Sequence, residues 1–280
     1  MKRLQFSQHL GWGLALAALL AICPSLPAQK RSNAANRTAP ATNKVNVSEL
    51  EPVAMNALRA MSNRLASATS FSFTAHIMRE EPGTNGQMLD FFRNIRVQAQ
   101  RPNRLRMEIQ SDTTDVDFWY DGRNLTLMPA SAKIYTTMAA EPTLDATLTM
   151  LKDKVQTHTP LIPFLRSDPY SILSDGLESA HQIGVVNDGN EQYLHLAFTE
   201  AEADWQLWLS GPNQILPRRL AVIYKNIEGQ PRVSIDFSNW NLNAEIPSSA
   251  FVFQKPAGAS AASWEALKPR TIAQQGGKSK

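Results

Sequence analysis

The chain is almost free of cysteine. Cys23 is the only cysteine among 280 residues, and it directly follows an apolar run from Leu10 to Ile22. Removal of residues 1–28 would leave a chain with no thiol, which excludes disulfides, thiolate catalysis and cysteine metal ligands. The fold must then be held by packing and hydrogen bonds alone.

Catalytic motifs are also missing. The sequence has no Gly-x-Ser-x-Gly elbow, no His-Glu-x-x-His pair and no glycine-rich phosphate loop. Asp112, Asp115 and Asp117 bunch together but lack the spacing and the distal glutamate of a calcium loop, so we interpret them as a solvated strand end. The histidines beyond the first 28 residues are scattered and show no metal-ligand spacing: His76, His158, His181 and His195. We therefore predict a protein that is not an enzyme and holds no cofactor or metal.

Residues 1–28 have the composition of a secretory signal segment. Lys2 and Arg3 give a positive start, the apolar run follows, and the small residue Ala28 ends the segment. The run is too short to span a bilayer comfortably, so we favour removal over an uncleaved membrane anchor. Lipidation of Cys23 is a further alternative, disfavoured because Ile22 is larger than the residue that a lipoprotein box requires. The prediction is export across the inner membrane into the periplasm.

Charge is unevenly distributed along the chain. Residues 29–48 are rich in Ala, Asn, Thr and Ser and carry four basic and no acidic residues, and residues 256–280 are also basic. Both segments read as disordered. The body, 49–254, has 17 basic and 24 acidic residues, which disfavours nucleic-acid binding because phosphate contact needs a basic face. The basic tails would at most allow peripheral contact with an anionic membrane, or they simply aid solubility.

Two segments have helical periodicity. Residues 48–68 repeat apolar side chains at three- and four-residue steps, and Ser48 is placed to cap the start of the helix. Residues 143–156 carry Leu144, Leu148 and Leu151 at the same spacing, and a proline-stiffened apolar segment, 160–165, follows them. A short turn or helix is expected to begin at Asp168-Pro169.

The rest of the body alternates between apolar and polar residues, as strands do. Asp121-Gly122 gives a strong hairpin signal. The fold class predicted is α+β, with a strongly curved antiparallel sheet and helices covering its concave face. The predicted strands are 71–77, 88–100, 105–109, 116–120, 125–128, 133–138, 181–186, 193–198, 205–209, 216–224, 232–240 and a closing strand at 250–254.

The sequence has more large apolar side chains than the core on one face of a sheet would bury. Trp205 and Trp208 have opposite parity in one strand, so apolar groups lie on both of its faces. The run from Pro160 to Leu165 is apolar yet stiff, as a cover over an apolar cavity would be. The alternative is an ordinary packed core. If a ligand cavity exists, we expect its lining or lid to include Trp119, Met128, Tyr135, Leu148, Leu151, Leu161, Phe164, Leu165 and Trp208.

Several short stretches resemble one family, the LolA/LolB-like periplasmic lipoprotein-localisation proteins. The stretches are Arg101-Pro-Asn-Arg-Leu-Arg-Met-Glu, the hairpin Phe118-Trp-Tyr-Asp-Gly-Arg-Asn-Leu-Thr-Leu-Met-Pro, and the ending Ile246-Pro…Phe251-Val-Phe253. Their order is similar to that family over residues 49 to 258, and the chain looks closest to an uncharacterised predicted periplasmic branch. The resemblance implies an incomplete barrel whose mouth is lidded by helices and whose hollow receives acyl chains or an apolar partner. The segment from about 139 to 190 is longer and more helical than that pattern.

These observations give one domain organisation and two candidate functions. We expect a signal peptide at 1–28, a disordered spacer at 29–48, a half-barrel domain at 49–255 and a disordered basic tail at 256–280. The first function is a non-catalytic carrier that holds a lipid, an acyl chain or an acylated protein in an apolar hollow, with the 143–156 helix and the 160–165 segment filling the hollow when it is empty. The alternative is an envelope sensing or protein-interaction domain that grips a protein partner.

Overall fold

A computed structural model describes residues 50–83, 85–112, 114–131, 133–155, 159–189, 191–211 and 214–263. The predicted signal segment, the spacer and Cys23 lie outside these residues, as does most of the predicted basic tail. Within the described part, no helix is both long enough and apolar enough to cross a membrane.

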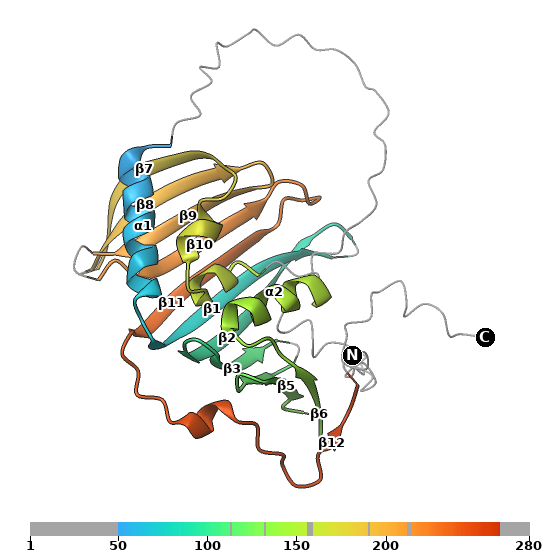
Figure 1. Cartoon of the computed structure of the whole chain (residues 1–280). Coiled ribbons are helices and arrows are strands. Elements are labelled where there is room, and N and C mark those ends of the chain that lie inside the picture. Colours follow the sequence, from blue (N-terminus) through green and yellow to red (C-terminus); the bar gives the residue numbers. More distant parts are fainter. Residues whose placement is uncertain are drawn as a thin grey trace.

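One twelve-stranded sheet dominates the structure (Figure 1). Its order is β12-β6-β5-β4-β3-β2-β1-β11-β10-β9-β8-β7, so β12 and β7 are free edges and the sheet does not close. All neighbours pair antiparallel except β12 with β6. The incomplete barrel expected from the sequence is confirmed. The strands are β1 (Ser70–Pro82), β2 (Met88–Gln100), β3 (Arg104–Ser111), β4 (Val116–Tyr120), β5 (Asn124–Pro129), β6 (Ile134–Ala139), β7 (Leu177–Asp188), β8 (Glu191–Glu200), β9 (Ala203–Ser210), β10 (Pro217–Tyr224), β11 (Arg232–Asn241) and β12 (Ser260–Ala261).

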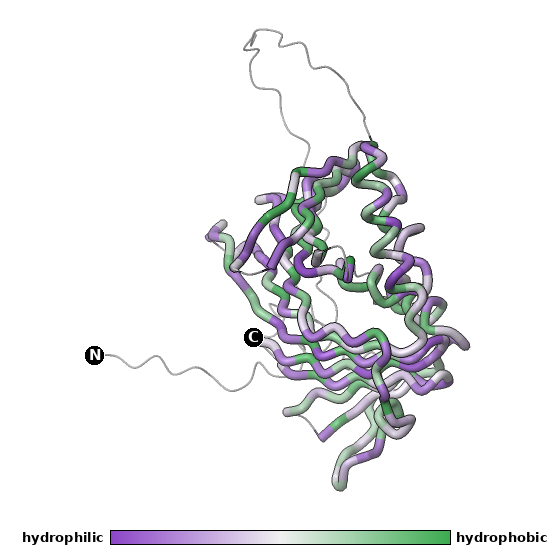
Figure 2. The backbone as a smooth tube through the Cα atoms, turned by 90° about the vertical axis from the view of Figure 1, so that its left-hand side faces the viewer, coloured by the Kyte–Doolittle hydropathy of each residue, from purple (hydrophilic) through white to green (hydrophobic). Residues whose placement is uncertain are grey.

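The helices lie on one side of this sheet. They are α1 (Pro52–Ala66), α2 (Leu144–Val155), the 3₁₀ turn η1 (Ile162–Leu165) and α3 (Pro169–Leu173). Figure 1 shows α1 in front of the β7–β10 end and α2 in front of β1 to β3. In the view turned by 90°, the sheet bends around the helices rather than lying flat (Figure 2). We call the side that faces them the concave face and the opposite side the outer face.

Strand alternation decides which side chains each face receives. In β1, Phe71, Phe73, Ala75 and Ile77 are buried, while the residues between them are partly or fully exposed. The strand β9 shows the same strict alternation along its whole length. Since register partners share a face, the buried positions of neighbouring strands line up into one continuous surface, which is mostly apolar and includes the buried Arg79 and Arg93. That surface is the concave face, and it needs a cover.

The leading helix begins later than the sequence pattern predicted. It starts at Pro52, with Glu51 as the N-cap residue and no side-chain cap. Proline suits this first turn because its missing N–H would have no intrahelical partner there. The buried face of α1 carries Ala54, Leu58, Met61 and Leu65, as the periodicity predicted.

The predicted closing strand at 250–254 is wrong. Residues 248–251 form a 3₁₀ turn, η2 (Ser248–Phe251), inside a segment of residues 242–259 that we call the strap. Pro247 and Pro256 bracket this stretch and do not supply the N–H groups of a ladder. The strap crosses to the far edge, where Ser260–Ala261 pair in parallel with β6. The start of the predicted disordered tail, 256–261, is thus part of the fold.

Glu51 fastens the start of α1 to the edge strand β7. Its N–H donates to the carbonyl oxygen of Ala180 at 2.9 Å, and its carboxylate accepts from the N–H of Gln182 at 2.8 Å. The ring nitrogen Nδ1 of His181 lies 3.1 Å from the same carboxylate. The hydrogen bond from Gln182, followed by that with His181, lowers the pKa of Glu51 below its ordinary value of 4.5.

We expect Glu51→Gln to destabilise the fold at neutral pH but not in strong acid. A carboxyl whose pKa is lowered on folding stabilises the folded state above its unfolded pKa, and this stabilisation is lost as pH falls through the folded value. Urea unfolding at a series of pH values measures it: the gap between wild type and variant shrinks below pH 4.5. Glu178→Gln, an exposed change on the same strand, is the control. A gap that stays constant down to about pH 2.5 contradicts the assignment.

Candidate functional site

The hollow of the sheet is filled by side chains from one inserted segment. We call α2 and residues Leu161–Leu165 the plug. Phe164 is fully buried, and the other plug side chains that the sequence singled out are at most 4% exposed. All of them belong to the same core cluster as the concave face: Leu148, Leu151, Leu161, Phe164 and Leu165. Five of the nine predicted lining or lid residues are therefore brought together here.

Aromatic rings receive the tip of the plug. The ring of Phe164 lies 5.0 Å from that of Phe237 on β11, centroid to centroid. Phe237 in turn contacts Phe73 at 5.9 Å and Trp240 at 5.8 Å, and Phe73 stacks on Trp240 at 4.3 Å. The sequence marked Phe73 only as a strand residue and did not assign Phe237 or Trp240 to the lining. The alternation of apolar residues in these two strands indicated a buried face. It could not show that β1 and β11 are neighbours, because the strands that pair are more than 150 residues apart in the sequence.

Arg101 is the main polar fastening of the plug. One guanidinium nitrogen donates to the carbonyl oxygen of Ala68, just after α1, at 2.9 Å. The other lies 2.5 Å from the carbonyl oxygen of Arg166 and 3.4 Å from that of Leu165, at the end of η1. The charged group also sits 4.7 Å above the ring of Phe71. Burial lowers the pKa of Arg101 below its ordinary value, and the charge of Asp145 partly counters this.

A second set of contacts joins the two halves of the plug. Arg166 donates to the carbonyl oxygen of Asp145 at 2.9 Å and to the hydroxyl of Thr149 at 3.0 Å. The carboxylate of Asp145 accepts hydrogen bonds from the N–H and the hydroxyl of Ser167. The backbone N–H of Leu144 donates to the carbonyl oxygen of Pro102, next to Arg101, at 2.7 Å. The plug is therefore a unit, tied to the sheet around residues 101–102.

The other four predicted lining residues do not reach the hollow. Trp119 alternates with the buried Phe118 and Tyr120, and Trp208 alternates with Leu207 and Leu209. All four lie on the outer face: Trp119, Met128, Tyr135 and Trp208. The sequence showed that Trp205 and Trp208 lie on opposite faces of their strand, but it did not show which of the two faces points into the hollow.

On the outer face these residues have local partners. Phe253 of the strap lies 5.1 Å from Trp119 and 4.8 Å from Tyr135, ring centroid to centroid. Trp208 stacks on His195 at 4.2 Å. A recess of about 290 Å³ lies under the strap between Trp119, Tyr135 and Phe253. The aromatic groups here fix the strap to the sheet.

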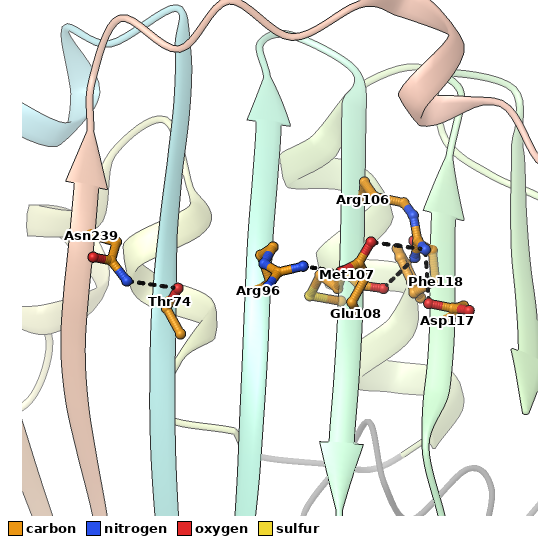
Figure 3. A network of polar contacts seen from close by, with 8 residues as sticks. All are labelled: Thr74, Arg96, Arg106, Met107, Glu108, Asp117, Phe118 and Asn239. Atoms are coloured by element: carbon orange, nitrogen blue, oxygen red, sulfur yellow. Dashed lines mark hydrogen bonds and ion pairs between the residues drawn. The ribbon is translucent and has the colours of Figure 1, made fainter. Parts of the chain in front are cut away.

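The outer face also carries an ion-pair network (Figure 3). Arg106 pairs with Asp117 at 2.8 Å and lies 4.1 Å above the ring of Trp119, and Arg96 pairs with Glu108 at 2.8 Å. Asp112 and Asp115 accept backbone hydrogen bonds from Phe92 and Ser111. The carboxylates of Asp112 and Asp115 thus accept hydrogen bonds from backbone N–H groups near the ends of strands. Among the residues that the structure describes, no three His, Cys, Asp or Glu side chains form a group that could hold a metal ion.

Comparison with known proteins identifies the family. The family described as "Predicted periplasmic protein (DUF2092)" matches residues 54–263, which is most of the chain and nearly all of the described part. The predicted periplasmic branch is confirmed by this match. No curated protein matches the chain.

Solved structures of the expected superfamily are similar to the chain. A LolA superfamily protein from Nitrosomonas europaea is 11% identical, covering 71% of this chain and 98% of its own, with a TM-score of 0.36. The lipoprotein LppX from Mycobacterium tuberculosis is 11% identical over 70% of this chain and 100% of its own, with a TM-score of 0.41. LprF from Mycobacterium bovis is 11% identical over 71% and 97%, with a TM-score of 0.41. Likeness at this level says nothing about what the present chain binds.

We expect Arg101→Met to loosen the plug. The change keeps an unbranched apolar stem but removes the guanidinium group and leaves three carbonyl oxygens without their donor, which costs about 2–3 kcal/mol. Urea unfolding measures the loss, and limited proteolysis shows whether cleavage concentrates between α2 and α3. Arg96→Met is the control, because that side chain is 69% exposed and its surface ion pair contributes about 1 kcal/mol or less. Equal effects of the two changes would contradict the role given to Arg101.

Proposed function

The chain belongs to the DUF2092 family of predicted periplasmic proteins, and we propose that it is an exported, non-catalytic carrier that holds a lipid, an acyl chain or an acylated protein in the hollow of its sheet. The observation that supports this proposal is the plug. The concave face is apolar over most of its extent, with the buried Arg79 and Arg93 toward the β1–β2 turn, yet part of its cover comes from one inserted segment that is fastened at few points. In this proposal the structure is the empty state, and ligand binding displaces the plug.

The burial free energy of an acyl chain in the hollow is similar to that of the plug side chains that now fill it. Burying an acyl chain yields about 0.8 kcal/mol per methylene, so about fifteen methylenes give roughly 12 kcal/mol. Each large aliphatic or aromatic side chain of the plug gains about 2 kcal/mol on burial, so Leu144, Leu148, Leu151, Leu161, Phe164 and Leu165 together give about 12 kcal/mol. The exchange of plug for ligand is then nearly balanced. A carrier needs this balance, because otherwise an acyl chain would be bound too tightly to release.

Prolines set the stiffness of the plug tip. Pro160 precedes the tip, Pro163 lies within it, and Pro169 begins α3 shortly after it. Proline fixes its own backbone and ends hydrogen-bonded elements, so the tip can move as a stiff unit. The proposal includes export by residues 1–28, a spacer at 29–48 and a carrier domain that begins near residue 49. It also includes transient contact of the basic tails with anionic lipid.

Replacing the tip of the plug by polar residues tests this function. In Phe164→Ser/Leu165→Ser the hollow loses its internal competitor, so cis-parinaric acid, a fluorescent fatty acid, should bind at least tenfold more tightly. Lipid that co-purifies from the native compartment, measured by mass spectrometry, should rise as well. Trp208→Ser is the matched control, because it removes a large ring from the outer face and leaves the hollow unchanged. Circular dichroism establishes that each variant is folded.

Two outcomes of this experiment contradict the carrier. One is a folded double variant with the affinity of the wild type for cis-parinaric acid. The other is the absence of fatty-acid binding and of co-purified lipid in every form of the protein.

The second candidate, a protein-interaction domain, is favoured by one feature of the edge strand β7. Its C-terminal half exposes Ile183 at 58%, Val185 at 60% and Val186 at 39%. Exposed aliphatic residues on a free strand edge are suited to adding an extended segment of a partner. Leu50 and Glu51 cover this edge only at Ala180 to Gln182. A stable protein partner that is lost in Ile183→Lys/Val185→Lys, together with absent fatty-acid binding, would favour this candidate over the carrier.

A further inference from the structure

A recess larger than the one under the strap lies at one end of the sheet, where Phe237 and Trp240 border it. Its volume is about 890 Å³, and the ends of β8, β9, β10 and β11 surround it. Tyr193 and Ser210 are register partners and both border it, whereas their neighbours Leu194 and Leu209 pair on the concave face. Tyr193 and Ser210 form one side of the recess, and Phe237 and Trp240, which pack with Phe73 on the concave face, form another, so the recess adjoins the hollow at the strand ends.

Two irregularities in adjacent strand pairs create this recess. The register of β10 against β9 shifts between Pro217 and Arg219, and that of β11 against β1 shifts opposite Ser72 to Thr74. Bulges of this kind bend a strand and re-aim its side chains, and they are frequent beside functional sites.

Backbone strain is concentrated in the same place. Asn239, in the second bulge, has a φ of 55°, and Ile215, next to the lining residue Leu216, has a φ of 47°. Such a conformation is unfavourable for a residue with a side chain, and it persists where the surroundings require it. Two of the three non-glycine residues with positive φ in the described part thus lie at this recess.

The lining consists mainly of neutral hydrogen-bonding groups. Carboxamides and hydroxyls both donate and accept hydrogen bonds, which is the property that the hydroxyl groups of a sugar require. These groups come from four different strands and turns, and they surround one open space. They are Asn187, Gln192, Ser210, Gln214, Ser238 and Asn239.

The charged groups at the recess already have partners. The hydroxyl of Tyr193 donates to the carboxylate of Glu191, and Arg218 Nε lies 3.4 Å from the same hydroxyl oxygen. Arg218 also donates to the carbonyl oxygen of Phe237 at 3.3 Å and lies 3.9 Å from Asp236. One cation facing two carboxylates leaves no excess positive charge for a phosphate or carboxylate ligand. An acyl chain in the recess would leave the carboxamides and hydroxyls of the lining without hydrogen-bond partners.

We propose that this recess binds a neutral carbohydrate, a short stretch of oligosaccharide held by the carboxamides and hydroxyls of the β8–β11 ends. The volume is within the range of ligand sites, from about 300 to 1,000 Å³. Trp240 borders the recess and offers an apolar ring surface beside the polar groups. In this proposal the glycan is held by the polar groups at the strand ends, and the lipid of the proposed carrier is held by the apolar hollow next to them.

Isothermal titration with chitotriose and with maltotriose tests the proposal, with inorganic phosphate as the anionic comparison. At least one trisaccharide should bind, and phosphate should not. Asn239→Gly and Gln192→Leu should each weaken that binding at least tenfold. Glycine suits the positive φ of position 239, so the first variant should fold normally. Asn94→Ala, an outer-face change beside His76, is the control that should bind as the wild type does.

Three results overturn the proposal: no heat from either trisaccharide at millimolar concentration, unchanged sugar binding in both recess variants, or phosphate binding in preference to sugar. Binding of cis-parinaric acid is measured in the same variants. It should be unaffected, so failure of the glycan site and failure of the lipid carrier are distinguished.

Discussion

An unclosed sheet with one apolar face must find a cover for that face, and the rest of this structure depends on how the cover is supplied. The concave face runs from Tyr120 on β4 to Phe198 on β8 with buried side chains at almost every inward position. Such a surface cannot remain exposed to water, because each large side chain would lose about 1.5–3 kcal/mol of burial free energy. Helix α1 covers one end permanently. The plug covers the middle.

The two covers are attached in different ways. Helix α1 is bridged to β7 at Leu50 and is held by Glu51, and Arg59 lies 3.8 Å above the ring of Tyr170 on α3. The plug relies on apolar contact and on the hydrogen bonds around Arg101 and Asp145. Apolar contact is not directional, so an acyl chain can replace it without new polar partners. In the proposed exchange the hydrogen bonds that Arg101 donates would have to be broken, so Arg101 would control the opening.

The sequence predicted the type of most elements but not the direction in which the sheet bends. Alternation of period two gave the strands, and the spacing of Leu144, Leu148 and Leu151 gave a helix with one buried face. The same alternation placed Trp119 and Trp208 in strands without telling which parity faces inward. That choice is made by long-range pairing, such as β1 with β11, which local sequence does not encode. The strap was misread for a related reason: Phe251 and Phe253 alternate as in a strand, but the prolines beside them turn the chain across the outer face.

Hydrogen exchange measured by mass spectrometry, with and without bound palmitate, tests the central claim most directly. If the plug is a removable cover, amides of α2 and of Leu161–Leu165 lose protection when the fatty acid binds, while β1, β2 and β3 keep theirs. If palmitate binds and the protection of α2 and Leu161–Leu165 is unchanged or increased, the ligand does not displace the plug, and the proposed exchange of plug for ligand is wrong.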